Sequence, residues 1–186
     1  MKVLKFGGTS VANAQNILLV EKIVKKESSE NRVVVVVSAL SGVTDGLISA
    51  AESASAKNEN YSETIKTLEE KHLEFVKNLL PITEQSSWLS FVKKNFNDIE
   101  DICNGIYVLG EFTPRIKDKI TAYGEFLSSN IIAAKLKSDG LDCVWLDSRN
   151  YIKTNSNFTD AKVNFETTNA ALQTYFKENK QQITLA

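Results

Sequence analysis

Two strand patterns and one helix pattern alternate in the first forty residues. Val3-Leu4 is a short apolar run, and Val33 to Val37 is a continuous β-branched run. Between them lies a stripe of apolar residues at helical spacing, formed by Ile17, Val20 and Val24 and widened by Leu19 and Ile23. A right-handed crossover would make the two strands parallel, with their carboxyl ends at one edge. The valine run predicts a strand covered on both faces.

Two long helical patterns occupy the middle of the chain. One apolar face runs from Tyr61 to Leu79 and the next from Trp88 to Ile106, with Pro81 between them. We expect a helical hairpin over about residues 61–110 that packs on an α/β body. His72 lies on the first of these faces, where a packed, hydrogen-bonded histidine is the usual explanation, so we assign it no chemistry.

Helix and strand patterns alternate again after the hairpin. Thr113-Pro114 starts a helix that stops at Asp139-Gly140, and strands are expected at Leu141 to Leu146 and Gln182 to Ala186, with a helix from Phe165 between them. The alternation predicts a three-layer α/β/α sandwich with a mainly parallel sheet. A final strand without a closing turn or helix suggests the N-terminal part of a larger domain.

Composition and charge exclude several classes of function. The 186 residues include 22 basic and 23 acidic side chains, and this balance offers no field that would attract nucleic acid or an anionic membrane. The longest apolar run is far too short to span a membrane, and no signal peptide precedes the first strand. Cys103 and Cys143 lack metal or disulfide spacing. We expect a cytoplasmic protein with small-molecule partners and no metal ligands of its own.

The segment Lys5-Phe6-Gly7-Gly8-Thr9-Ser10 carries the first candidate site. Its glycines fall in a strand-to-helix turn, where the backbone can approach a ligand and a helix N-terminus favours an anion. Lys5 adds a positive charge, so a phosphate is the predicted ligand. The alternative is a tight turn that needs glycine, since neither the dinucleotide nor the P-loop fingerprint is present.

Further polar candidates follow the second strand and interrupt a helix. Ser38 ends the valine strand, and Thr44 and Asp45 stand near the start of the next helix, where capping is the alternative role. Gly124-Glu125 lies inside a helix, where glycine costs about 1 kcal/mol relative to alanine and therefore suggests a close approach, for example by a neighbouring helix. The alternative for Glu125 is a solvated surface carboxylate.

Together these segments resemble an aspartokinase of the amino-acid kinase family. The motifs are Lys5 to Ser10, Ser38-Ala39-Leu40-Ser41-Gly42-Val43-Thr44-Asp45 and Tyr123-Gly124-Glu125. The opening residues 2–14 and the segment 106–110 look most like bifunctional aspartokinase–homoserine dehydrogenases, and residues 154–162 look like the family's third-strand region. The resemblance covers the whole chain.

The resemblance implies ATP-dependent phosphorylation of the β-carboxylate of L-aspartate, the first step toward lysine, threonine and methionine. It implies that Lys5 stabilises the transferring phosphoryl group and that the backbone of Gly7-Gly8, with Thr9 and Ser10, holds its oxygens. Ser38 and Thr44 would contact aspartate, and Glu125 would receive its ammonium group. ATP with Mg²⁺ and a homo-oligomeric full-length protein are implied as well.

One departure from the family pattern limits what the chain is expected to do alone. The Thr-Leu-Gly-Arg-Gly-Gly-Ser-Asp-like stretch of the family's nucleotide-binding half is absent. We therefore expect residues 1–186 to form the aspartate and phosphate side of a kinase domain, inactive by itself. The alternatives are another amino-acid kinase, acting on glutamate or acetylglutamate, and a non-catalytic ligand-binding domain.

Overall fold

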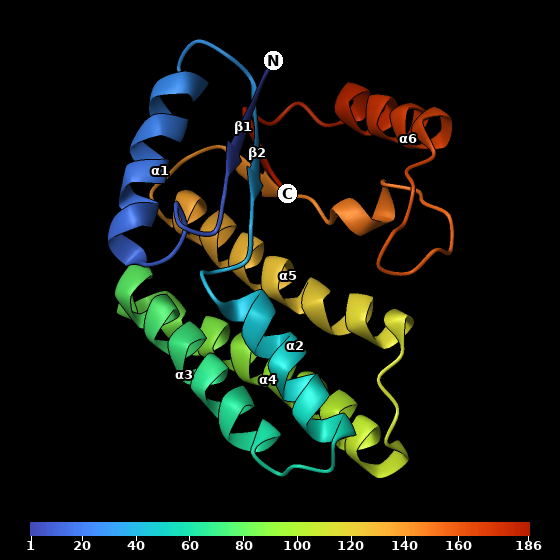
Figure 1. Cartoon of the computed structure of the whole chain (residues 1–186). Coiled ribbons are helices and arrows are strands. Elements are labelled where there is room, and N and C mark those ends of the chain that lie inside the picture. The colour runs from blue at the N-terminus through green and yellow to red at the C-terminus, as the bar shows by residue number, and fades with distance from the viewer.

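The strands form one four-stranded parallel sheet, in the upper half of the view in Figure 1, in a computed structural model that describes all 186 residues. The strands are β1 (Lys2–Phe6), β2 (Val33–Val37), β3 (Cys143–Trp145) and β4 (Ile183–Leu185), in the order β1-β2-β4-β3. The predicted parallel pairing of the first two strands is confirmed, because β1 and β2 are in register up to Phe6 and Val37. Both strands therefore end at the same edge of the sheet.

Helices cover both faces of this sheet, and a helical hairpin extends from it. The helices are α1 (Ala14–Ser28), α2 (Val43–Ser55), α3 (Tyr61–Leu79), α4 (Ile82–Leu109), α5 (Pro114–Ser138), the 3-10 helix η1 (Ser148–Asn150) and α6 (Phe165–Glu178). In Figure 1, α1 and α5 lie on one side of the sheet and α6 on the other, while α3 and α4 pack with α2 away from the strands. The predicted three-layer architecture and hairpin are thus confirmed. None of these helices combines the length and the apolar character needed to cross a bilayer.

The two faces of the sheet are covered to different extents, which corrects the prediction for the valine run. Val33, Val35 and Val37 are buried in the main core, whereas Val34 and Val36 are only half-buried. The reason is that α6 covers the second face only in part. The predicted stripe of α1 was also too wide: Ile17, Val20 and Val24 are buried, but Leu19 and Ile23 are exposed.

Three local predictions about turns and strands are corrected as well. The helix after the glycine turn begins at Ala14, with Asn13 as its cap, and not directly after Gly8. Helix α2 is preceded by Gly42 at a φ of 77°, so neither Thr44 nor Asp45 caps it. Residues 154–162 form no strand, because only one antiparallel bridge, from Thr154 to Val163, joins the two ends of this loop.

Candidate functional site

The glycine turn after β1 exposes its backbone at Gly7. The Ser10 amide donates to the Gly7 carbonyl at 2.9 Å, which closes the turn. Neither glycine has a positive φ, and a Cβ atom added to Gly7 would meet no atom within 4 Å. Conformation and internal packing therefore do not require glycine at position 7. Open space above the backbone at this point would admit a ligand to the peptide groups of the turn.

Asn16 fastens this turn to the first turn of α1. Its Nδ2 donates to the Thr9 carbonyl at 2.7 Å, while its own amide donates to Asn13 Oδ1 at 2.9 Å. The N-terminus of α1 is therefore linked to the glycine turn but does not follow it directly. The turn's own amides and Lys5, which is exposed near the end of β1, are the groups left to meet an anion.

The loop after β2 brings Ser38 next to the end of β1. The Ser38 amide donates to the Phe6 carbonyl at 3.1 Å, and the Ser38 carbonyl accepts from Ser128 Oγ at 2.8 Å. Both backbone groups of Ser38 are thus held, whereas its hydroxyl makes no hydrogen bond within the chain. Gly8 is close to the same loop, because a Cβ built on it would lie 3.4 Å from the Ala39 carbonyl oxygen.

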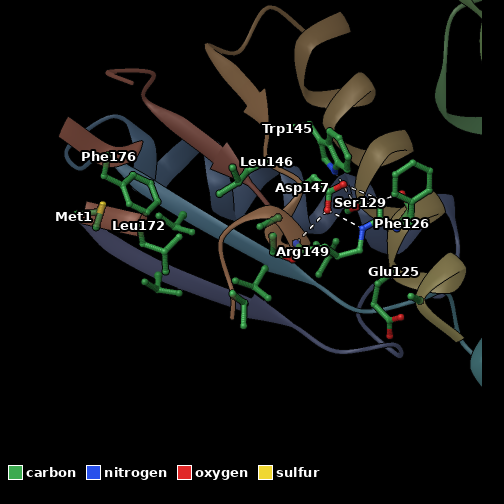
Figure 2. Close-up of a pocket in the computed structure, with 18 residues that line it drawn as sticks. Met1, Glu125, Phe126, Ser129, Trp145, Leu146, Asp147, Arg149, Leu172 and Phe176 are labelled. Carbon is green, nitrogen blue, oxygen red and sulfur yellow. Dashed lines mark hydrogen bonds and ion pairs between the residues drawn. The ribbon is translucent and has the colours of Figure 1, made fainter. Parts of the chain in front are cut away.

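Helix α5 contributes Glu125 to the same place through a very close approach at Gly124. A Cβ built on Gly124 would lie 2.8 Å from Ala39 Cβ and 3.7 Å from Thr44 Oγ1. The predicted close approach is confirmed, and its partners are a neighbouring helix, α2, at its first turn, and the loop after β2. Figure 2 shows the Glu125 side chain projecting from α5, away from Phe126 and Arg149.

The charged side chains brought to this edge have no ionic partner within the chain. The three ion pairs of the molecule are Lys2–Glu27, Lys135–Asp139 and Asp147–Arg149. Lys5 and Glu125 belong to none of them, and Thr44 makes no side-chain hydrogen bond. The structure therefore brings Gly7, Gly8, Ser38, Thr44 and the Gly124-Glu125 pair to neighbouring turns, with their polar side chains available to a ligand.

A cavity of about 470 Å³ on the second face of the sheet is lined by a polar pair, Asp147 and Arg149, that was not predicted from the sequence. Glu125 lines this cavity together with Asp147 and Arg149, beside mostly apolar residues (Figure 2). Asp147 accepts from Arg149 Nε at 2.8 Å and Nη2 at 2.7 Å, and the guanidinium lies 4.6 Å from the centre of the Phe126 ring. These hydrogen bonds lower the pKa of Asp147 and raise that of Arg149. The pair follows the carboxyl end of β3, where ligands of α/β sheets bind, and this was the one feature of the sequence that could have indicated it.

Nothing in the chain gathers three His, Cys, Asp or Glu side chains as candidate metal ligands. The two cysteines are buried singly, and His72 is buried in the hairpin with its Nδ1 at 2.7 Å from the Leu68 carbonyl. The polar groups near the glycine turn are thus the principal candidates for chemistry.

Several proteins of known name are similar to this chain over most of its length. The chloroplastic bifunctional aspartokinase/homoserine dehydrogenase 1 of Arabidopsis thaliana is 34% identical over 187 residues, covering 99% of this chain and 20% of the relative. The bifunctional enzyme of Buchnera aphidicola is 30% identical, covering 93% of this chain and 22% of the relative. The aspartokinase of Chlamydia pneumoniae is 33% identical, covering 88% of this chain and 33% of the relative. The chain thus spans about a fifth to a third of the length of these relatives.

Solved structures agree with the fold. Escherichia coli aspartokinase III in complex with aspartate and ADP superposes with a TM-score of 0.86 at 22% identity, covering 99% of this chain and 40% of that one. Clostridium acetobutylicum aspartate kinase gives a TM-score of 0.67 at 15% identity. The family model described as the amino acid kinase family matches residues 1–184. The chain therefore belongs to the amino acid kinase family.

Proposed function

We propose that this chain is the aspartate- and phosphoryl-binding part of an aspartate kinase. The observation that carries the proposal is the meeting of three segments at one sheet edge: the glycine turn, the Ser38–Thr44 loop and the Gly124-Glu125 turn of α5. Ligands of open α/β sheets bind at this edge. The names of the relatives, and the aspartate bound in the structure of the similar aspartokinase III, support the same substrate.

The chemistry of the site suits a carboxylate that attacks a phosphoryl group. The β-carboxylate of aspartate is ionised at pH 7, so the reaction needs no general base, and catalysis consists mainly of positioning and charge neutralisation. Lys5 would face the phosphoryl oxygens, with the backbone of Gly7 and Gly8 and the hydroxyls of the next two residues, Thr9 and Ser10. Ser38 and Thr44 would hold aspartate, and the Glu125 carboxylate would pair with its ammonium group.

A nucleotide is the proposed phosphoryl donor. ADP is present in the similar aspartokinase III, of which this chain covers 40%. We propose ATP as the phosphoryl donor, with Mg²⁺ bound through the triphosphate, and a second nucleotide-binding element outside residues 1–186. Those residues alone should then show little turnover, because orientation of the two substrates is worth about 7–11 kcal/mol of barrier. A cytoplasmic location, a homo-oligomer and a linked homoserine dehydrogenase stay predictions.

A substrate panel on the intact protein tests the proposal. ADP release would be coupled to a dehydrogenase assay with L-aspartate, L-glutamate or N-acetyl-L-glutamate, and the acyl phosphate would be trapped with hydroxylamine. We expect ADP release and hydroxamate formation with aspartate alone. Turnover with glutamate or acetylglutamate instead would favour another amino-acid kinase, and ligand binding without turnover would favour a non-catalytic domain.

A further inference from the structure

The loop between β2 and α2 is anchored at both ends but exposed in its middle. Ser38 is held through both backbone groups, and the Val43 amide donates to the Leu40 carbonyl at 3.0 Å. Between these anchors, Ser41 and Gly42 are exposed. Gly42 precedes α2 in a left-handed conformation and provides no side-chain cap, so no side chain of the loop itself holds the peptide between Ser41 and Gly42.

Support for this peptide comes from the helical hairpin, through Lys71 of α3. Lys71 Nζ donates to the Ser41 carbonyl oxygen at 2.5 Å, across 30 residues of sequence. It is the only side chain that hydrogen-bonds to the Ser41-Gly42 part of the loop. The hydrogen bond is charge-assisted and therefore stronger than one between neutral groups.

The position of Lys71 is itself fixed by tight packing between α2 and α3. A Cβ built on Gly46 of α2 would lie 2.9 Å from Leu68 Cδ2, so the two helices approach closely at this point. Lys71 follows Leu68 by one helical turn and therefore stands on the same side of α3. Lys71 also lines a cavity of about 510 Å³, where Glu74 is the only other charged residue and forms no ion pair with it.

We infer that Lys71 is a positioning residue for the aspartate site, a role that rests on the proposed function. By holding the Ser41 carbonyl, Lys71 fixes the peptide that leads into α2, and so sets where Thr44, in the first turn of α2, presents its hydroxyl. The hairpin is then part of the substrate site although it contributes no group that touches substrate. Loss of the tether loosens the grip on aspartate more than the grip on the nucleotide, because Ser41 leads into α2 but only touches the glycine turn at Gly8.

Steady-state kinetics on the intact protein test this role with three variants. Lys71→Met removes the ammonium but keeps the stem, and Lys71→Arg keeps a cation. Lys66→Met is the matched control, on an exposed lysine of the same helix whose side chain makes no hydrogen bond. Lys71→Met should raise the KM for aspartate about tenfold, the size expected for one charge-assisted hydrogen bond, and should raise the KM for ATP less. Lys71→Arg should restore most of the affinity. A KM for aspartate equal to that of Lys66→Met would overturn the inference.

Hydrogen exchange separates a failure of this inference from a failure of the proposed function. If the unaltered protein does not phosphorylate aspartate, the proposed function fails, yet the tether still predicts faster amide exchange in residues 38–45 of Lys71→Met than of Lys66→Met. Equal exchange in the two variants would overturn the role of Lys71 whatever the substrate is. Melting curves on both variants check that the hairpin stays folded.

Discussion

A Cβ atom on Gly124 would lie 2.8 Å from Ala39 Cβ, closer than real Cβ atoms approach one another. Helix α5 can therefore lie against the loop after β2 only because position 124 has no side chain. The helix gives up about 1 kcal/mol of propensity for this glycine, and in return Glu125 comes to the edge where β1 and β2 end.

Gly124→Ala should destabilise the protein and disturb the candidate site. The added methyl group must push the loop or the helix aside, which costs roughly 1–3 kcal/mol and outweighs the gain in helix propensity. Gly105→Ala in α4 is the matched control, because a Cβ there meets nothing within 4 Å. Urea unfolding should show a lower free energy of unfolding for Gly124→Ala and one about 1 kcal/mol higher for Gly105→Ala. A gain at both positions would contradict the close approach.

Lys5→Ala should lower turnover of the intact protein far more than it weakens aspartate binding. A cation that faces the phosphoryl group contributes more as negative charge moves in the transition state, so kcat should fall by about 10²–10³. Lys2→Ala is the control in the same strand, since Lys2 pairs with Glu27 and not with the site. Equal kcat values for the two variants would remove Lys5 from catalysis.

Glu125→Gln should chiefly raise the KM for aspartate. A carboxylate that pairs with the substrate ammonium acts in the ground state and the transition state alike, and its loss should cost on the order of 2–4 kcal/mol if water is excluded. If Glu125 were only a surface residue of α5, the substitution would leave the aspartate dependence unaltered. Kinetics measured beside a melting curve distinguish the two results.

Acid should destabilise the hairpin through His72. Burial lowers the pKa of His72 from 6.5 to about 4, so the unfolded chain takes up this proton at a higher pH than the folded one. The free energy of unfolding is therefore unaffected by His72 above pH 6.5 and falls as the pH drops toward 4, by on the order of 3 kcal/mol in all. His72→Leu should flatten this part of the pH profile of unfolding free energy. An unchanged slope would show that folding does not lower the pKa of His72.

Both thiols should react slowly with a disulfide reagent at pH 8 in the folded protein. Burial raises the pKa of Cys103 to about 11 and that of Cys143 to about 12, so little thiolate is present. Modification should be at least about a hundredfold slower than in guanidinium, where both thiols become normal. Rapid labelling of one cysteine without denaturant would reveal local opening of its helix or strand.

The sequence predicted those parts of the fold that depend on local pattern. The valine run is β2, and the apolar faces that begin at Tyr61 and Trp88 are α3 and α4. The exposure of Leu19 and Ile23 could not be predicted, because the width of a buried stripe depends on what packs against the helix. The partial cover over Val34 and Val36 is likewise set by the distant helix α6.

The site was predictable as a set of segments but not as a set of contacts. Two parallel strands had to end together, so Gly7-Gly8 and Ser38 could be expected at one edge. Asn16 and Lys71 donate hydrogen bonds to carbonyls in the loops after β1 and β2, and no sequence pattern predicts such contacts. Arg149 was not predicted as a site residue because its position depends on contacts with Asp147 and Phe126, which hold its guanidinium in place.

The strand order has a consequence for how the nascent protein folds. Strand β4 lies between β2 and β3 although it is made after both, and the Ala186 amide donates to the Val35 carbonyl at 2.9 Å. Until that segment leaves the ribosome, the valine strand keeps a bare β-branched edge that other chains can join. Chaperone dependence during synthesis should therefore fall when Ile183–Leu185 emerges, because that strand closes the gap in the sheet.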